Sequence, residues 1–159
     1  MANVSGEKRT DAGSRVIRAL PQKIYRALLD PAAVASWRPP KGMKGEIHTF
    51  EPREGGRFRM SLVYAGTDHA LRGKTSEHAD VVEGRFLKLV PDARVVELVE
   101  FVADDPAFAG AMTITTTLTP VPDGTEVHIV CENVPEGISA ADHQAGIAST
   151  LENLAAFTE

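Results

Sequence analysis

The sequence lacks most of the features that mark specialised protein classes. Its single cysteine, Cys131, excludes an internal disulfide and favours a reducing compartment. No apolar run approaches the ~20 residues of a membrane-spanning helix, and the polar segment 1–13 has no apolar centre of the kind found in signal peptides. We therefore expect a cytoplasmic protein that does not associate with membranes.

Positive charge is also scarce. The net charge is −5 at pH 7, and acidic and basic residues are interspersed along the chain. A sequence-independent nucleic-acid binder needs a basic surface to displace counterions, and a protein held on a membrane surface by polybasic segments needs one too. The charge therefore argues against both classes of partner.

Strong catalytic and metal-binding motifs are absent as well. The chain has no Gly-x-Ser-x-Gly elbow, phosphate-binding glycine loop or dinucleotide fingerprint. Glu77, His78 and Asp80 lie close together, but their spacing matches no strong metal-ligand motif. Cys131 lies in an apolar strand, which is typical of an inert thiol. We expect no cofactor and no metal, and the sequence favours a binding protein over an enzyme without deciding between them.

The most informative segment that is present is the last one, 139–157, which predicts a long amphipathic helix. Its apolar residues recur at three- and four-residue steps, which places them on one face: Ile147, Ala148, Leu151, Leu154 and Ala155. Ser139 followed by Asp142 is typical of a capping box at a helix start. A helix with one apolar face needs a surface to pack on, and the strands before it are the only candidate.

The rest of the chain predicts short strands and two short helices. We expect strands over 14–20, 47–50, 57–64, 80–90, 94–101, 112–119 and 125–131, helices over 21–29 and 32–37, and a loop over 66–79. Pro21 suits a first helical position and Asp30 an N-cap. Strands in hairpin-like succession imply an antiparallel sheet. The expected fold class is therefore α+β, with a curved sheet of six or seven strands wrapped around the C-terminal helix, as one domain over 14–159 after a flexible segment 1–13.

The chain carries several short motifs whose order and spacing resemble those of the START and birch-pollen-allergen-like (SRPBCC) superfamily. The resemblance is greatest to its bacterial branch related to the activator of the heat-shock-protein-90 ATPase. The motifs are Pro21-x-x-Ile-Tyr-Arg-Ala-Leu-x-Asp-Pro31, Trp37 followed by Pro-Pro-x-Gly42, Gly55-Gly-Arg-Phe-Arg-Met60, Val82-x-Gly-x-Phe-x-x-x-Val-Pro91 and Asp142-His-x-x-Gly146-x-x-x-x-Leu-x-x-Leu154. The resemblance covers roughly residues 14–157. It implies a helix-grip fold with a pocket between sheet and terminal helix, but it fixes no activity. Many relatives carry Gly-Trp where this chain has Gly146-Ile147.

We expect the functional site in this space between sheet and helix. Ligand pockets are mostly apolar with a few placed polar groups, and Tyr64 and His143 would supply the polar groups here. Trp37 is either a gate to the pocket or an anchor for the second helix. His143 either contacts a ligand or acts as an acid–base group, or else it is an exposed or capping histidine in the first turn of the helix. The expected ligand-lining residues are Trp37, Phe58, Met60, Tyr64, Phe86, Phe101, Met112, His143, Ile147 and Leu151.

Three functions remain open at this point. The preferred hypothesis is binding of a small, largely apolar ligand. The second is a polyketide-cyclase-like or hydrolase-like enzyme that uses the same cavity and needs a polar group with a shifted pKa, such as His143 or Tyr64, inside it. The third is a chaperone-interacting module similar to the ATPase activator, which would expose a sizeable patch instead of a cavity. The sequence leaves a homodimer open.

Overall fold

The fold consists of one sheet with helices packed on one side. The computed structural model describes residues 9–39, 42–64, 79–102 and 106–159, apart from the side chains of Tyr64 and Ala79. In chain order the elements are β1 (Arg9–Ile17), α1 (Pro21–Leu28), α2 (Pro31–Trp37), β2 (Met43–Phe50), β3 (Arg57–Tyr64), β4 (Ala79–Val90), β5 (Arg94–Phe101), the short 3-10 turn η1 (Pro106–Phe108), β6 (Met112–Val121), β7 (Gly124–Val134) and α3 (Ala140–Thr158).

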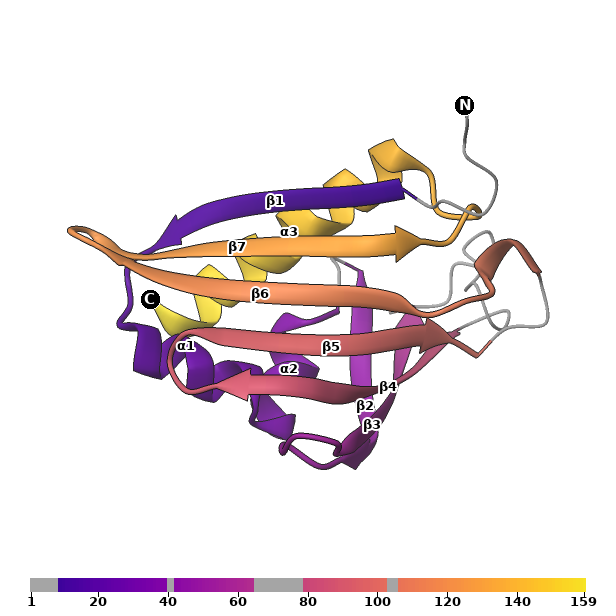
Figure 1. The fold of residues 1–159 in the computed structure, drawn as a ribbon, viewed down its shortest axis with the longest axis horizontal. Helices are drawn as coiled ribbons and strands as arrows, with labels where there is room; N and C mark the ends of the chain where they lie inside the picture. The colour runs from indigo at the N-terminus through magenta and orange to yellow at the C-terminus, as the bar shows by residue number, and fades with distance from the viewer. Residues whose placement is uncertain (1–8, 40–41, 65–78, 103–105) are drawn as a thin grey trace.

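The sheet is antiparallel throughout and has the strand order β1-β7-β6-β5-β4-β3-β2. Each strand from β2 to β7 pairs with its neighbour in sequence, and β1 joins the edge beside β7. The three helices lie on one side of the sheet, and β2 and β3 curl away from the plane of the other strands (Figure 1). This arrangement confirms the predicted α+β class with a curved antiparallel sheet and a long C-terminal helix.

Local sequence signals explain where the helices begin. Pro21 and Pro31 occupy the first positions of α1 and α2, where a missing N–H leaves no hydrogen bond unmade. At α3, the Ser139 hydroxyl accepts a 3.1 Å hydrogen bond from the backbone N–H of Asp142, as the capping box predicts. Asp30 does stand at the N-cap of α2, but its side chain makes no capping hydrogen bond, so that part of the prediction is wrong.

Several strands are longer than predicted. β1 begins at Arg9 and ends at Ile17, so residues 9–13 belong to the sheet and not to a flexible lead-in. β2 begins at Met43 and β7 ends at Val134. In each case the added residues are polar or include glycine, and they form strand because their backbone pairs with a neighbouring strand. Arg9, for example, pairs with Val134. Residues 1–8 and nearly all of the predicted loop 66–79 lie outside the described residues.

The apolar face of α3 forms part of the main core. Ile147, Leu151, Leu154 and Ala155 are buried in one cluster with residues of the sheet and of α1 and α2, whereas Ala148 is exposed and does not share this face. The helix packs chiefly against β1. None of the helices in the described ranges has the length and hydropathy of a membrane span.

Candidate functional site

A row of side chains crosses the helix-facing side of the sheet from β1 to β4. Directly paired residues of an antiparallel sheet point to the same face, and five successive strands contribute one residue each. We call this the central row; from β1 through β7, β6 and β5 to β4 it consists of Asp11, Cys131, Ile114, Glu97 and Phe86. The row places two carboxyl groups on a face that is otherwise mostly apolar.

The first carboxyl, Glu97, is paired with an arginine that reaches across the concave face. Arg38 directly follows α2, and its Nη2 donates to both carboxylate oxygens of Glu97, at 3.2 and 3.3 Å. The Glu97 side chain is 5% exposed and that of Arg38 is 20% exposed. The Arg38 guanidinium also lies 4.9 Å from the ring centre of Trp37, which holds it in place by a cation–π contact.

One donor atom of this ion pair lacks a hydrogen-bond acceptor among the described residues. In the part of the chain that the structure describes, Arg38 Nε is buried and has no hydrogen-bond acceptor. Buried N–H groups are nearly always bonded, so an isolated exception calls for a physical explanation. Sequence reasoning missed both residues. Arg38 lies just outside the helix predicted over 32–37, and in the strand predicted over 94–101 Val96 and Leu98, on the face opposite Glu97, are apolar as well as Val95 and Val99.

The second carboxyl, Asp11, ties β1 to the start of α3. Arg9 Nε donates to both carboxylate oxygens of Asp11, at 2.9 and 3.0 Å, and His143 Nδ1 lies 2.6 Å from Oδ2. The Arg9 hydrogen bonds lower the pKa of Asp11, burial opposes this, and His143 lowers it further. Because an ionised carboxylate can only accept, Nδ1 of His143 is the donor. The predicted site residue His143 is therefore held with its ring oriented, and Nε2 is the nitrogen left for other partners.

Replacing Asp11 by asparagine should destabilise the protein at neutral pH and have little effect in acid. The folded-state pKa lies below the ordinary value of 3.8, so the ionised carboxylate stabilises the fold above that pH. This stabilisation is lost as the pH falls through the lowered folded-state pKa. We expect a loss of about 2 kcal/mol at pH 7 in urea unfolding, shrinking below about pH 4. The exposed hairpin variant Asp123→Asn is the control, and an equal loss for Asp11→Asn at both pH values would contradict the account.

The thiol in the central row is unreactive. Cys131 is buried, and its desolvation, together with the negative charge of Asp11, raises its pKa to about 12. A thiol with such a pKa stays protonated at physiological pH and is neither a nucleophile nor a metal ligand. The structure thus agrees with the expectation of an inert cysteine.

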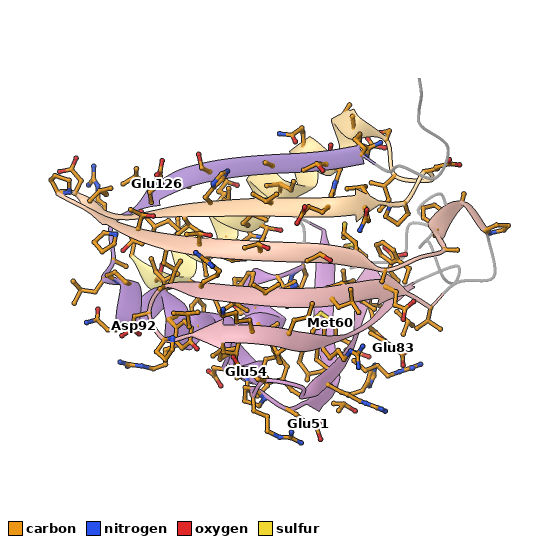
Figure 2. The ribbon with its side chains drawn as sticks, viewed as in Figure 1. Glu51, Glu54, Met60, Glu83, Asp92 and Glu126 are labelled. Carbon is orange, nitrogen blue, oxygen red and sulfur yellow. The ribbon has the colours of Figure 1, made fainter. Side chains whose placement is uncertain are left out.

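Most predicted ligand-lining residues of the sheet occupy neighbouring positions on the concave face. Phe58, Met60, Phe86 and Met112 are buried there, and Phe101 is half-buried. The ring of Phe86 packs against that of Phe58 at 5.2 Å between centres. Met60 lies inside the curve of the sheet in Figure 2, whereas Glu83 lies at its outer margin. The Tyr64 side chain lies outside the described residues.

Several apolar side chains on this face remain partly exposed, among them Ile47 and Phe50 on β2. Leu62, Phe101 and Ile114, which we call the apolar trio, are only half-buried although they point to the helix side. Ile114 belongs to the central row, and Leu62 and Phe101 lie between this row and the end of the sheet where β3 and β5 finish and β6 begins. A completed core would bury all three, so this end of the concave face still has apolar surface to cover.

Trp37 serves as an anchor. Its side chain is 2% exposed, and its indole Nε1 donates a 2.8 Å hydrogen bond to the carbonyl oxygen of Ala27 in α1. The bond ties the end of α2 to α1 and positions the adjacent Arg38. Of the two roles considered for Trp37, the geometry favours the anchor.

No metal site is formed by the residues described. Glu77 and His78, two members of the weak metal motif, lie outside them, and Asp80 is buried on β4. Among residues 9–39, 42–64, 79–102 and 106–159, no three histidine, cysteine or acidic side chains come together in a way that could hold an ion.

A separate hollow lies on the outer side of the helices. It has a volume of about 510 Å³ between α1, α2 and the C-terminal end of α3, and its lining includes Tyr25, Leu29 and Phe157. It contains none of the predicted site residues. It is therefore the natural alternative against which binding at the concave face must be tested.

The fold and the motifs place the chain among known proteins. Residues 18–159 match the family described as "Activator of Hsp90 ATPase homolog 1-like protein". The chain belongs to this family. No curated protein matches it.

Solved structures of bacterial members of this fold are similar over nearly the whole chain. A Chromobacterium violaceum protein is 31% identical with a TM-score of 0.80, covering 95% of this chain and 98% of that one. A Mesorhizobium loti protein is 25% identical with a TM-score of 0.71, covering 94% and 96%. An AHSA1-like protein from Aeromonas hydrophila, 18% identical with a TM-score of 0.70 and covering 94% and 91%, shares the fold.

In this member of the family, Ile147 packs against the backbone of β1. A Cβ atom added to Gly13 would lie 2.8 Å from Ile147 Cγ2 and 3.8 Å from Leu151 Cδ1, so the glycine allows α3 to approach the strand closely. Ile147 and Leu151 thus lie beside β1, one step further along α3 from His143. The helix extends from the central row away from the apolar trio.

Proposed function

We propose that this AHSA1-like domain binds a small, largely apolar molecule between the concave face of the sheet and the N-terminal part of α3. The observation that carries the proposal is the apolar trio, Leu62, Phe101 and Ile114, which faces inward and is only half-buried. Apolar surface removed from water contributes roughly 25 cal/mol per Å². A ligand that completes the burial of these side chains would gain that free energy.

The direction of α3 supports the same location. His143 near its start meets Asp11 in the central row, and Ile147 further along lies at Gly13. The helix therefore covers the sheet on one side of the central row, and the apolar trio lies on it or beyond it on the other side. Polar groups at the central row, above all Glu97 and the Arg38 that is paired with it, would then meet one end of the ligand, as in pockets that are apolar with a few placed polar groups.

A thermal-shift and native mass-spectrometry screen of medium-chain ketones, esters and polycyclic aromatics tests the proposal. A ligand at about 100 times its Kd stabilises the folded state by about 2.7 kcal/mol, which should raise Tm by roughly 5 to 10 °C. Ile114→Phe should fill the space and remove the shift. Thr115→Phe adds the same ring at the next residue, which points to the other face of the sheet, and should keep it.

Two outcomes would count against this function. One is a screen in which no ligand class raises Tm or forms a complex. The other is a ligand whose binding Thr115→Phe weakens as much as Ile114→Phe does, since that would place the site outside the concave face.

A further inference from the structure

The unpartnered Nε of Arg38 carries information about the ligand. The atom is buried, and no acceptor for it is found in the described parts of the chain. The guanidinium is held on two sides, by Glu97 at 3.2 and 3.3 Å and by the Trp37 ring at 4.9 Å. Its orientation is therefore fixed before any ligand arrives, and a fixed donor without an acceptor is a ready point of recognition.

The charge around this donor is already balanced. The positive charge of Arg38 is matched by Glu97, and Asp11 is matched by Arg9. An incoming anion would meet these carboxylates in a poorly solvated place where, among the described residues, Arg38 and Arg9 are each already paired with a carboxylate, which is unfavourable. A neutral oxygen that accepts one hydrogen bond has no such penalty.

We propose that the ligand of this site carries a neutral hydrogen-bond acceptor, the carbonyl oxygen of a ketone, ester or amide, which accepts from Arg38 Nε. This inference rests on the proposed function. Ile114 is the direct cross-strand neighbour of Glu97, so the apolar part of the ligand lies against the apolar trio while its carbonyl reaches Arg38. Arg38 is then the residue that sets specificity, and Glu97 is the residue that makes the site select neutral ligands over anionic ones.

Three ligands with eleven carbons each test the inference by calorimetry or native mass spectrometry: methyl nonyl ketone, undecanoate and undecane. The wild-type protein should bind the ketone about tenfold more tightly than either of the others, because undecane lacks the acceptor and undecanoate adds an unbalanced charge. Glu97→Gln removes the balancing charge and should reverse the order of ketone and undecanoate. Glu83→Gln makes the same chemical change on the opposite face, where Glu83 pairs with Arg59, and should keep the wild-type order.

The outcomes separate this inference from the proposed function. If undecane or undecanoate binds the wild-type protein as tightly as the ketone, the inference is overturned while apolar binding stands. If none of the three binds, the proposed function fails and the inference fails with it. Should Glu97→Gln not fold, the double variant Arg38→Met with Glu97→Met replaces it; this variant has no donor and should bind ketone and undecane equally, and a retained preference for the ketone would contradict a role for Arg38.

Discussion

Replacing Glu97 by glutamine should lower the free energy of unfolding by about 3 kcal/mol. Removing one partner of a buried ion pair leaves the other charge uncompensated and costs about 3 to 5 kcal/mol. The lower end applies because the Arg38 side chain is 20% exposed, whereas that of Glu97 is 5% exposed. Urea unfolding followed by the fluorescence of Trp37, the sole tryptophan, measures the change directly.

Two matched variants show whether burial is the cause. Glu83→Gln breaks the ion pair with Arg59, whose side chains are 43% and 45% exposed, and should cost at most about 1 kcal/mol. The double variant Arg38→Met with Glu97→Met removes both charges together and should be close to neutral, as for other buried pairs replaced by apolar residues of similar volume. If Glu97→Gln were no worse than Glu83→Gln, the Arg38–Glu97 pair would not be buried in solution.

Truncating Trp37 to alanine should destabilise the protein by about 3 to 5 kcal/mol. The indole is 2% exposed and donates the 2.8 Å hydrogen bond to Ala27, so the variant loses buried volume and leaves that carbonyl unpaired. Thermal unfolding followed by circular dichroism measures the loss without needing the tryptophan.

An exposed aromatic residue provides the control for this substitution. Phe157, near the end of α3, is 45% exposed, and Phe157→Ala should change the stability far less. A loss below about 1 kcal/mol for Trp37→Ala would mean that the indole packs loosely, which would return Trp37 to the role of a gate over the pocket.

The elements that the sequence predicts best are those specified by neighbouring residues. The three- and four-residue spacing of Ile147, Leu151 and Leu154 identified α3 and its buried face, and Ser139 marked its start correctly. Within the strand predicted over 57–64, the alternate residues Phe58 and Met60 were expected to face the pocket, and both are buried on the concave face of β3. In both cases the pattern reflects contacts that repeat along a single element, so one sequence contains the whole signal.

The features that the sequence did not predict depend on contacts between segments that are distant in the chain. The start of β1 at Arg9 is set by β7, more than a hundred residues away, and polar side chains there gave no strand pattern. Arg38 and Glu97 meet only because the sheet curls under α2. Both faces of β5 carry apolar residues, such as Val96 and Val99, so the sequence did not indicate that Glu97 points inward. His143 was placed on the inner face, but its partner Asp11 lay in the segment expected to be flexible.

The central claim is that a small apolar ligand occupies the concave face of the sheet. Titration of methyl-labelled protein with methyl nonyl ketone, followed by NMR, tests it most directly. We predict saturable chemical-shift changes at the methyl groups of Leu62 and Ile114, with those of Leu29 and Ala33, which line the outer hollow, unchanged. Changes confined to Leu29 and Ala33, or no saturable changes at all, would contradict the claim.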